Sequence, residues 1–518
     1  MRNWYSFYEI LKFPLEILLF AVVLAGTGNL LTNPNLFYSG YITNQYVLMI
    51  GEIILRTGNF LITNFPLLFL IRLSARKGGS ATSVSSAIAG YVGFLIATMY
   101  FAPQGLAATA YSSILGLSVG TSRVPGFGSE VRYPLQTGIF AALIVAFVTL
   151  GAFNRSRNRS EYGFFGFISK EASVTIRSVI FCTAAGILMA FIWPFLLSGV
   201  TRVVNFIASD TTNPINLALY GIGDRFLGSL NLGTLIRQPF WYTVSGGSWM
   251  NLAGTSVTGD VPIWTSQLAA NALTGISGRF FTPYYVLNIF AVPGMIWGMF
   301  SMCTDAIERR KKRWLCILAT AASLLSGTLL PLELMLLLLC PLLYVFHLAY
   351  TGVLYALLHG MHIYLGFRSS EALTLTAMPG TLPEFLTYME YPTLNHTLVQ
   401  IAVIGVISMV IYFVVTRVYF KYLAVDLFNT GSKDRIVKET IRAFGGIENV
   451  KMIQSSVSVL TVSVYDPNLV RPERLRKLGS YRLYETRAGY NICFGAASTM
   501  IRRGIGAAMR ESVRTVNE

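Results

Sequence analysis

Long apolar stretches recur along most of this chain, and each has about the length that a helix needs to cross a bilayer. The clearest are residues 13–31, 85–102, 137–153, 179–200, 284–302 and 397–420. A longer run, 314–367, holds at least two more, divided by a Gly/Pro break at 327–331, and residues 51–71 and 203–223 are spans with polar residues inside. The pattern predicts a polytopic α-helical membrane protein with about ten spans or re-entrant segments.

Composition supports this expectation. Of 518 residues, 53% are hydrophobic and only 12% are charged, whereas soluble domains average about 25% charged residues. The N-terminal apolar segment has no small-residue cleavage site, so we expect it to be retained as the first span.

Orientation is predicted from Lys and Arg in short loops, which favour the cytoplasmic side. The loops at 154–160 and 309–313 are rich in both, and Arg417 and Lys421 end the last span. We expect a multi-pass protein of the cell membrane with both termini in the cytoplasm. The five Cys and four His do not cluster, so the sequence predicts neither a disulfide framework nor a metal site, and no cofactor.

The C-terminal segment differs in kind. From Gly431 to the end there are 15 Lys and Arg against 8 Asp and Glu, and the apolar runs become short. Pattern predicts helices at 434–446, 471–478 and 495–510, and strands at 457–465, 481–487 and 490–494. The expected division is a transmembrane domain, 1–425, and a small cytoplasmic α+β domain, 426–518. Its positive charge favours anionic lipid or an acidic partner over nucleic acid.

Several segments, in matching order, resemble the glucose–glucoside branch of the bacterial phosphotransferase system. Residues 333–352 (ELMLLLLCPLLYVFHLAYTG), 238–249 (QPFWYTVSGGSW) and 64–75 (NFPLLFLIRLSA) resemble its membrane subunit, enzyme IIC. In the tail, 445–450, 460–466 and 490–495 are similar to the framework of its enzyme IIB domain. The resemblance implies that IIC carries sugar while IIB phosphorylates it. It also implies IIA or IIB partners and a homodimer, with Ala87, Ala89 and Gly90 offering a small-residue packing face.

The chain departs from that pattern at functional positions. The family's double His in a G-L-H-H turn falls on Gly233 and Thr234, and the first Glu of its T-E-P-x-E turn falls on Leu330. The phosphocysteine position is Ser456, and the neighbouring Arg pair is absent. A Ser hydroxyl without an adjacent base is a weak nucleophile. We therefore expect no catalytic residue in a IIB-like domain that keeps its fold.

The resemblance places substrate-binding positions at Arg225 and Glu333, and the expected site also includes Gly233, Thr234 and Asn64. Charges at membrane depth are costly, so they usually line a cavity or pair with each other. A structural ion pair between Arg225 and Glu333 is thus the alternative to sugar binding. Thr234 and Asn64 have a second interpretation as caps of broken helices.

Three functions are compatible with the residues. The first is a glucose-, maltose- or glucoside-type sugar permease whose phosphorylation depends on another IIB protein or is lost. The second is a non-transporting or uncoupled sensor on the same scaffold, which the departures above favour. The third, a proton-coupled secondary transporter, needs an ionisable relay. His347 is the candidate, but a mid-helix His more often has a structural role.

Overall fold

The computed structural model describes the chain with gaps. Outside the described residues lie 1, 37–41, 79–80, 104–109, 120–130, 158–168, 251–253, 274, 303–305, 369–377, 423–431, 456–458, 479, 481, 487–488, 495–496 and 518. The rest forms two compact units. One comprises residues 10–296 and 317–413, and the other comprises 1–9, 297–316 and 414–518. The predicted boundary at 425/426 and the Ser456 position both lie outside the described residues.

Helices dominate, and in the described part seven are long and apolar enough to cross a membrane by length and composition. These are Ile10–Thr32, Gln45–Thr63, Ala81–Phe101, Glu171–Ser209, Thr282–Ser301, Pro341–Gly360 and Pro392–Phe420. Three shorter apolar helices are Phe65–Ala75, Ile139–Arg155 and Leu330–Leu339. The polytopic helical class predicted from the sequence is confirmed.

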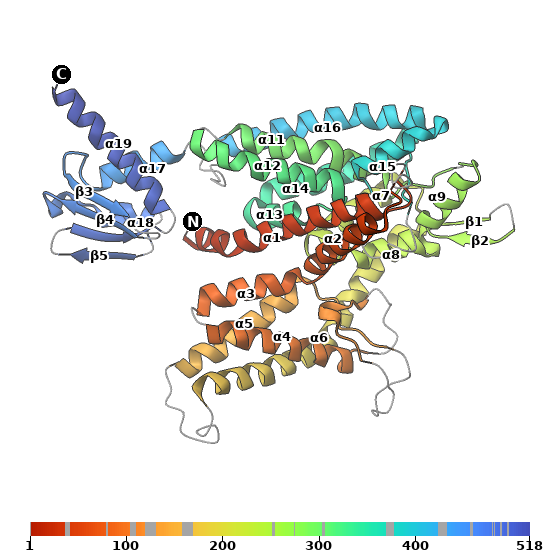
Figure 1. Ribbon diagram of the computed structural model, residues 1–518, viewed down its shortest axis with the longest axis horizontal. Helices are drawn as coiled ribbons and strands as arrows, with labels where there is room; N and C mark the ends of the chain where they lie inside the picture. The colour runs from red at the N-terminus through yellow and green to blue at the C-terminus, as the bar shows by residue number, and fades with distance from the viewer. Residues whose placement is uncertain are drawn as a thin grey trace. The chain divides into compact units, whose positions relative to one another are not determined.

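The first part of the chain builds a helical bundle. Its elements are α1 (Arg2–Thr32), α2 (Gln45–Thr63), α3 (Phe65–Gly78), α4 (Ala81–Phe101), η3 (Ile114–Gly116), α5 (Ile139–Arg157) and α6 (Lys170–Ser209). Helices α3 to α6 pack side by side (Figure 1). Small residues allow this: a Cβ on Gly90 of α4 would lie 2.8 Å from Cys182 Sγ of α6. Because Gly90 faces α6 of the same chain, it is not available to pair two copies, contrary to expectation.

Two expected spans are broken, and polar side chains explain both breaks. Residues 51–71 divide at Asn64, whose Nδ2 donates to Phe60 O at 2.9 Å while its Oδ1 accepts from Leu115 N at 2.8 Å. Residues 203–223 divide after α6, where the side chain of Asn213 accepts from Ile215 N and starts the next helix. The expectation of one continuous span in each range was therefore wrong.

The second half of the helical region follows α6. It contains α7 (Pro214–Ser229), α8 (Thr234–Tyr242), η4 (Val244–Gly246), α9 (Asp260–Ala269), α10 (Thr282–Tyr285), the π-helical turn η5 (Val286–Ala291) and α11 (Val292–Ser301). An unpredicted antiparallel hairpin, β1 (Ser248–Met250) and β2 (Ser256–Thr258), pairs Trp249 with Val257. Helix α7 packs closely on α14 (Pro341–Gly360), and buried aromatic rings of Tyr220, Phe240 and Phe280 fill the core beside them.

The expected break at 327–331 is confirmed, because α12 (Ala306–Ser326) ends before it and α13 (Leu330–Leu339) begins within it. Gly327 has φ +69° and lies against backbone oxygens of Met378 and Pro379, which requires glycine. The remaining elements are α14 (Pro341–Gly360), α15 (Leu382–Thr387), η7 (Tyr388–Glu390), η8 (Pro392–Leu394) and α16 (Asn395–Tyr422).

The tail forms the predicted small α+β domain. Its elements are α17 (Ser432–Ala443), β3 (Val450–Ser455), β4 (Val459–Val464), η9 (Pro467–Leu469), α18 (Pro472–Lys477), β5 (Arg482–Thr486), β6 (Gly489–Cys493) and α19 (Ala497–Asn517). The sheet is antiparallel with strand order β3-β4-β6-β5, and α17 and α19 pack on each other. Leu460, Val462, Ile492, Ile501 and Ile505 are its fully buried centre. Strand β3 was not predicted.

Candidate functional site

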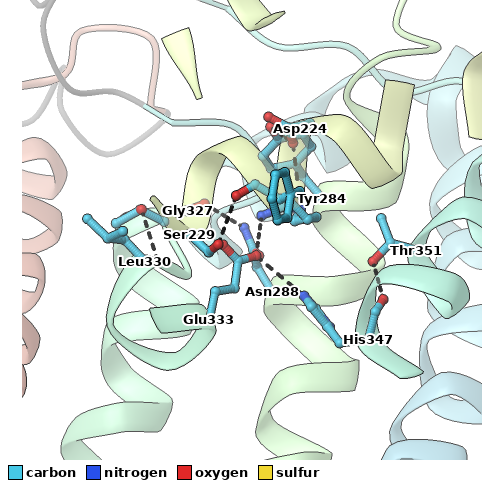
Figure 2. A network of polar contacts seen from close by, with 12 residues as sticks. Asp224, Ser229, Tyr284, Asn288, Gly327, Leu330, Glu333, His347 and Thr351 are labelled. Carbon is cyan, nitrogen blue, oxygen red and sulfur yellow. Dashed lines mark hydrogen bonds and ion pairs between the residues drawn. The ribbon is translucent and has the colours of Figure 1, made fainter. Parts of the chain in front are cut away.

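A network of buried charged side chains joins α7, α13 and α14 (Figure 2). Arg225 Nη1 of α7 lies 3.3 Å from Glu333 Oε1 of α13, and both side chains are at most 2% exposed. An isolated charge buried this deeply has a high desolvation cost, and pairing with an opposite charge offsets part of that cost. Two residues singled out from the sequence, 108 positions apart, are thus in direct contact.

Asp224 forms the second acidic centre of the network. Its side chain is fully buried, Tyr284 donates to its Oδ2 at 2.5 Å, and the Nε of Arg237 donates to its Oδ1. Arg225 Nε lies 3.6 Å from Asp224 Oδ2, and its guanidinium lies 4.0 Å from the Tyr284 ring centroid. Two arginines therefore balance two carboxylates.

His347 links the network to α16. Its Nε2 lies 3.4 Å from Glu333 Oε1, and its Nδ1 lies 2.9 Å from the hydroxyl of Tyr412. Both ring nitrogens have partners, and the side chain is fully buried. This arrangement fits the structural histidine favoured by the sequence, here one that holds the carboxylate of Glu333 in place.

Local structure fixes Glu333. It lies in the first turn of α13, where the positive end of the helix dipole favours a carboxylate. The turn before it is tethered, because Asn288 Nδ2 donates to Gly327 O at 2.9 Å and Ser323 Oγ donates to Asn288 O at 2.6 Å (Figure 2). The hydroxyls of Ser229 on α7 and Tyr344 on α14 lie 2.7 Å apart, beside Arg225.

Arg225 keeps donor capacity that the described protein groups do not use. Its Nη2 and Nε are buried and make no hydrogen bond in the part of the chain that the structure describes. A buried donor without a hydrogen bond costs about 1–3 kcal/mol, more for a charged group. These two nitrogens can still donate to a further acceptor.

The other expected site residues are placed differently. Gly233 caps α8 and lies against Arg237, while Thr234 Oγ1 donates to Gln136 Oε1 at 2.7 Å. Asn64 uses its side chain to close the end of α2. Of the expected residues, Arg225 and Glu333 therefore lie at the centre of the buried network, and Gly233 touches it through Arg237. Thr234 joins α8 to Gln136, and Asn64 closes the end of α2.

Arg237 and Tyr284 were not predicted from the sequence. A signal for Arg237 does exist: it follows Gly233 by one helical turn, just before the Pro-Phe-Trp-Tyr motif, and an arginine beside an apolar helix needs a partner. Tyr284 carried no such signal, because it is one of 27 tyrosines. Among the described residues no group of three or more His, Cys, Asp or Glu is placed to hold a metal ion.

Apolar helices around a buried, charge-balanced polar network define a class of protein: a polytopic membrane protein with an internal site for a polar solute. Residues 9–352 match the model of the family described as phosphotransferase system, EIIC. The chain belongs to this family and is a sugar permease of that system.

The chain is similar to one curated relative and to one solved structure. The chain is 26% identical over 530 aligned residues to the PTS system glucoside-specific EIICBA component of Staphylococcus carnosus (strain TM300), covering 97% of this chain and 72% of that protein. It is also similar to the crystal structure of the transporter ChbC, the IIC component of the N,N'-diacetylchitobiose-specific phosphotransferase system. That match has 11% identity and a TM-score of 0.31, over 84% of this chain and 96% of that one.

Proposed function

We propose that this permease carries a glucoside-type sugar across the membrane and binds it at the Arg225–Glu333 pair. The observation that carries the proposal is the pair itself: a carboxylate and a guanidinium with unused donors, buried together at a helix break. The similarity to a glucoside-specific component supports the substrate class.

Sugar hydroxyls suit this pair chemically. A hydroxyl both donates and accepts, so one hydroxyl can donate to Glu333 while a neighbour accepts from Arg225. Hydrogen bonds to charged groups are stronger than neutral ones, and low dielectric strengthens them further. In this proposal Gly233 leaves room for Arg237, Thr234 ties the start of α8 to Gln136, and Asn64 fixes the end of α2.

Phosphorylation, in this proposal, does not involve a catalytic residue of this chain. Ser456 stands at the phosphocysteine position, without a base or Arg beside it in the sequence. We infer that the 426–518 domain is a scaffold and that a separate IIB protein supplies phosphate, or that transport is uncoupled. The 1–425 domain then carries the sugar path, with both termini in the cytoplasm.

A sensor is the second candidate. What favours it is the joint loss of the His pair, the first Glu and the phosphocysteine, although the Arg225–Glu333 pair is kept. A permease and a sensor would both bind sugar, so a binding assay does not distinguish them, whereas an uptake assay does. Proteoliposomes that take up radiolabelled methyl glucoside, with or without an intact IIB protein and its phosphodonor, support the permease; binding without uptake in either case supports the sensor.

The binding site is tested with purified full-length protein and methyl α- and β-D-glucopyranoside. Glu333→Gln and Arg225→Ala should each weaken binding by at least about tenfold, because a hydrogen bond to a charged group contributes about 1.5–3 kcal/mol. Glu52→Gln is the matched control, since Glu52 pairs with Arg56 at 2.6 Å on an exposed helix face. If both site variants fold and bind with wild-type affinity, the pair is structural and the sugar binds elsewhere.

A further inference from the structure

A pocket of about 290 Å³ lies apart from the buried network and shares no lining residue with it. Its walls come from the loop after α9, the residues after α14 and the start of α16. Lining residues include Trp264, Asn271, Ser277, His362, Tyr364 and Thr397. The volume is at the lower end of the range of ligand pockets, about 300–1,000 Å³, so it suits one small ring.

The lining is polar, aromatic and free of carboxylates, Lys and Arg. The side chains of Asn271, His362 and Thr397 make no hydrogen bond to another described residue. They offer an amide, an imidazole and a hydroxyl, which together both donate and accept. Tyr364 donates to His359 Nδ1 at 2.9 Å, and burial raises its pKa, so it stays a neutral phenol.

The pocket is held in shape. Trp264 donates from Nε1 to the Tyr388 hydroxyl at 3.1 Å, which fixes its ring. Asn271 and His362 have φ of +48° and +55°, and they are two of four non-glycine residues with positive φ in the described chain. Each residue lies just past a helix end, where Asn and His are among the side chains that tolerate this conformation. Backbone hydrogen bonds close both ends, from Ala272 N to Gln267 O at 2.9 Å and from Ile363 N to Leu358 O at 3.0 Å. Two fixed helix ends thus form separate walls of one pocket.

We propose that this pocket is a second carbohydrate site that takes a single neutral sugar ring. Aromatic surface suits the apolar face of a pyranose, and the neutral donors and acceptors suit its hydroxyls. The site lies at the start of α16, whose other end carries Arg417 and Lys421. With that basic end in the cytoplasm, the pocket faces the side from which sugar arrives, so it serves as a capture site before the buried network. It goes beyond the proposed function, because it uses none of the same residues.

Cysteine protection tests the site in the full-length protein. Cys182, Cys316, Cys340 and Cys493 are buried, so a Cys303→Ser background should leave little native labelling. Thr393→Cys places a thiol in the pocket lining, and Met389→Cys, 59% exposed and outside the lining, is the matched control. Labelling by N-ethylmaleimide is followed by intact mass with methyl α- or β-D-glucopyranoside present. At several times the Kd, at least one sugar should slow labelling at 393 at least about fivefold and leave 389 unchanged.

The labelling results distinguish a second sugar site from a single one. Protection at 393 that persists in Glu333→Gln and is lost in Asn271→Ala/His362→Ala supports a second site. It does so even if Glu333→Gln leaves total sugar binding unchanged, which would overturn only the proposed function. Protection that disappears with Glu333→Gln means that one site does all the binding and overturns this inference. Protection by inorganic phosphate instead of sugar, or none by either sugar, also overturns it.

Discussion

Two glycines lie against the guanidinium of Arg237 and set how it packs. A Cβ on Gly233 would lie 2.6 Å from Arg237 Cζ, and one on Gly228 would lie 2.8 Å from Nη2. Real Cβ atoms do not approach that closely. Both positions are therefore glycine for space, which lets an arginine from α8 reach Asp224 on α7.

This packing predicts the behaviour of a pair of variants. Arg237→Ala removes a cation from a buried carboxylate and should destabilise the protein by about 3–5 kcal/mol. Gly233→Ala should lower the free energy of unfolding by part of this amount, because the added Cβ pushes Arg237 aside. The double variant should be about as stable as Arg237→Ala. Thermal unfolding in detergent measures all three. Arg56→Ala, in an exposed pair, is the control and should cost about 0–1 kcal/mol. Additive losses would mean that Gly233 acts independently of Arg237.

At this scale the sequence singled out two residues that meet in the buried network, Arg225 and Glu333, and missed their surroundings. Arg225 and Glu333 are identifiable because a charge next to an apolar run demands an explanation. The role of Asp224 depends on Tyr284 and Arg237, which approach it from two other helices. Contacts between residues on different helices cannot be predicted from the local sequence.

Among the elements, α1 and α2 approach each other through glycine. A Cβ on Gly58 would lie 2.5 Å from Ala25 N, and one on Gly28 would lie 2.4 Å from Leu55 N. Backbones this close have no room for a side chain, as is common between membrane helices.

Gly58→Leu should therefore force α1 and α2 apart and lower the thermal stability in detergent by several degrees or more. Gly151→Leu on α5 is the control, because nothing lies within 4 Å of a Cβ there. A helical glycine replaced without a clash should be neutral or stabilising by up to about 1 kcal/mol. Equal unfolding temperatures for the two variants would contradict the close approach.

Element prediction succeeded where apolar length decided the matter and failed where single polar side chains did. Asn64 ends a helix inside an apolar stretch by bonding to backbone groups of two segments. Strand β3 was not predicted because it lies at a sheet edge and has one buried residue, Val450. Its alternation of buried and exposed residues is therefore weak. In contrast, β4 alternates regularly between buried and half-buried residues and was identified.

For the whole molecule, the homodimer stays a prediction from family resemblance. Light scattering in detergent should give a protein mass of twice 57.1 kDa. Gly90 is already packed on α6, so the interface must lie elsewhere on the surface. Gly90→Ala should then affect folding more than association. A monomeric mass at every concentration would exclude the dimer under those conditions.

The C-terminal domain provides a second prediction at this scale. Full-length protein incubated with a phosphorylated IIA donor should show no phosphate in intact mass. The reason is chemical: a serine replaces the thiolate, and Val459 and Thr461 replace the two arginines. A family member with its phosphocysteine is the positive control. Stoichiometric phosphate on Ser456 would contradict the scaffold role.

The two charge pairs of the network can form only at different times during synthesis of the chain. Asp224 and Arg237 are 13 residues apart, so they can pair almost as soon as they leave the ribosome. Arg225 must wait for Glu333, 108 residues later, which takes about 5–20 s at typical translation rates. During that interval Asp224, 3.6 Å from Arg225 Nε in the finished protein, is the nearest anion. Until Glu333 has been synthesised, Asp224 is thus the one carboxylate of this network that both arginines can reach.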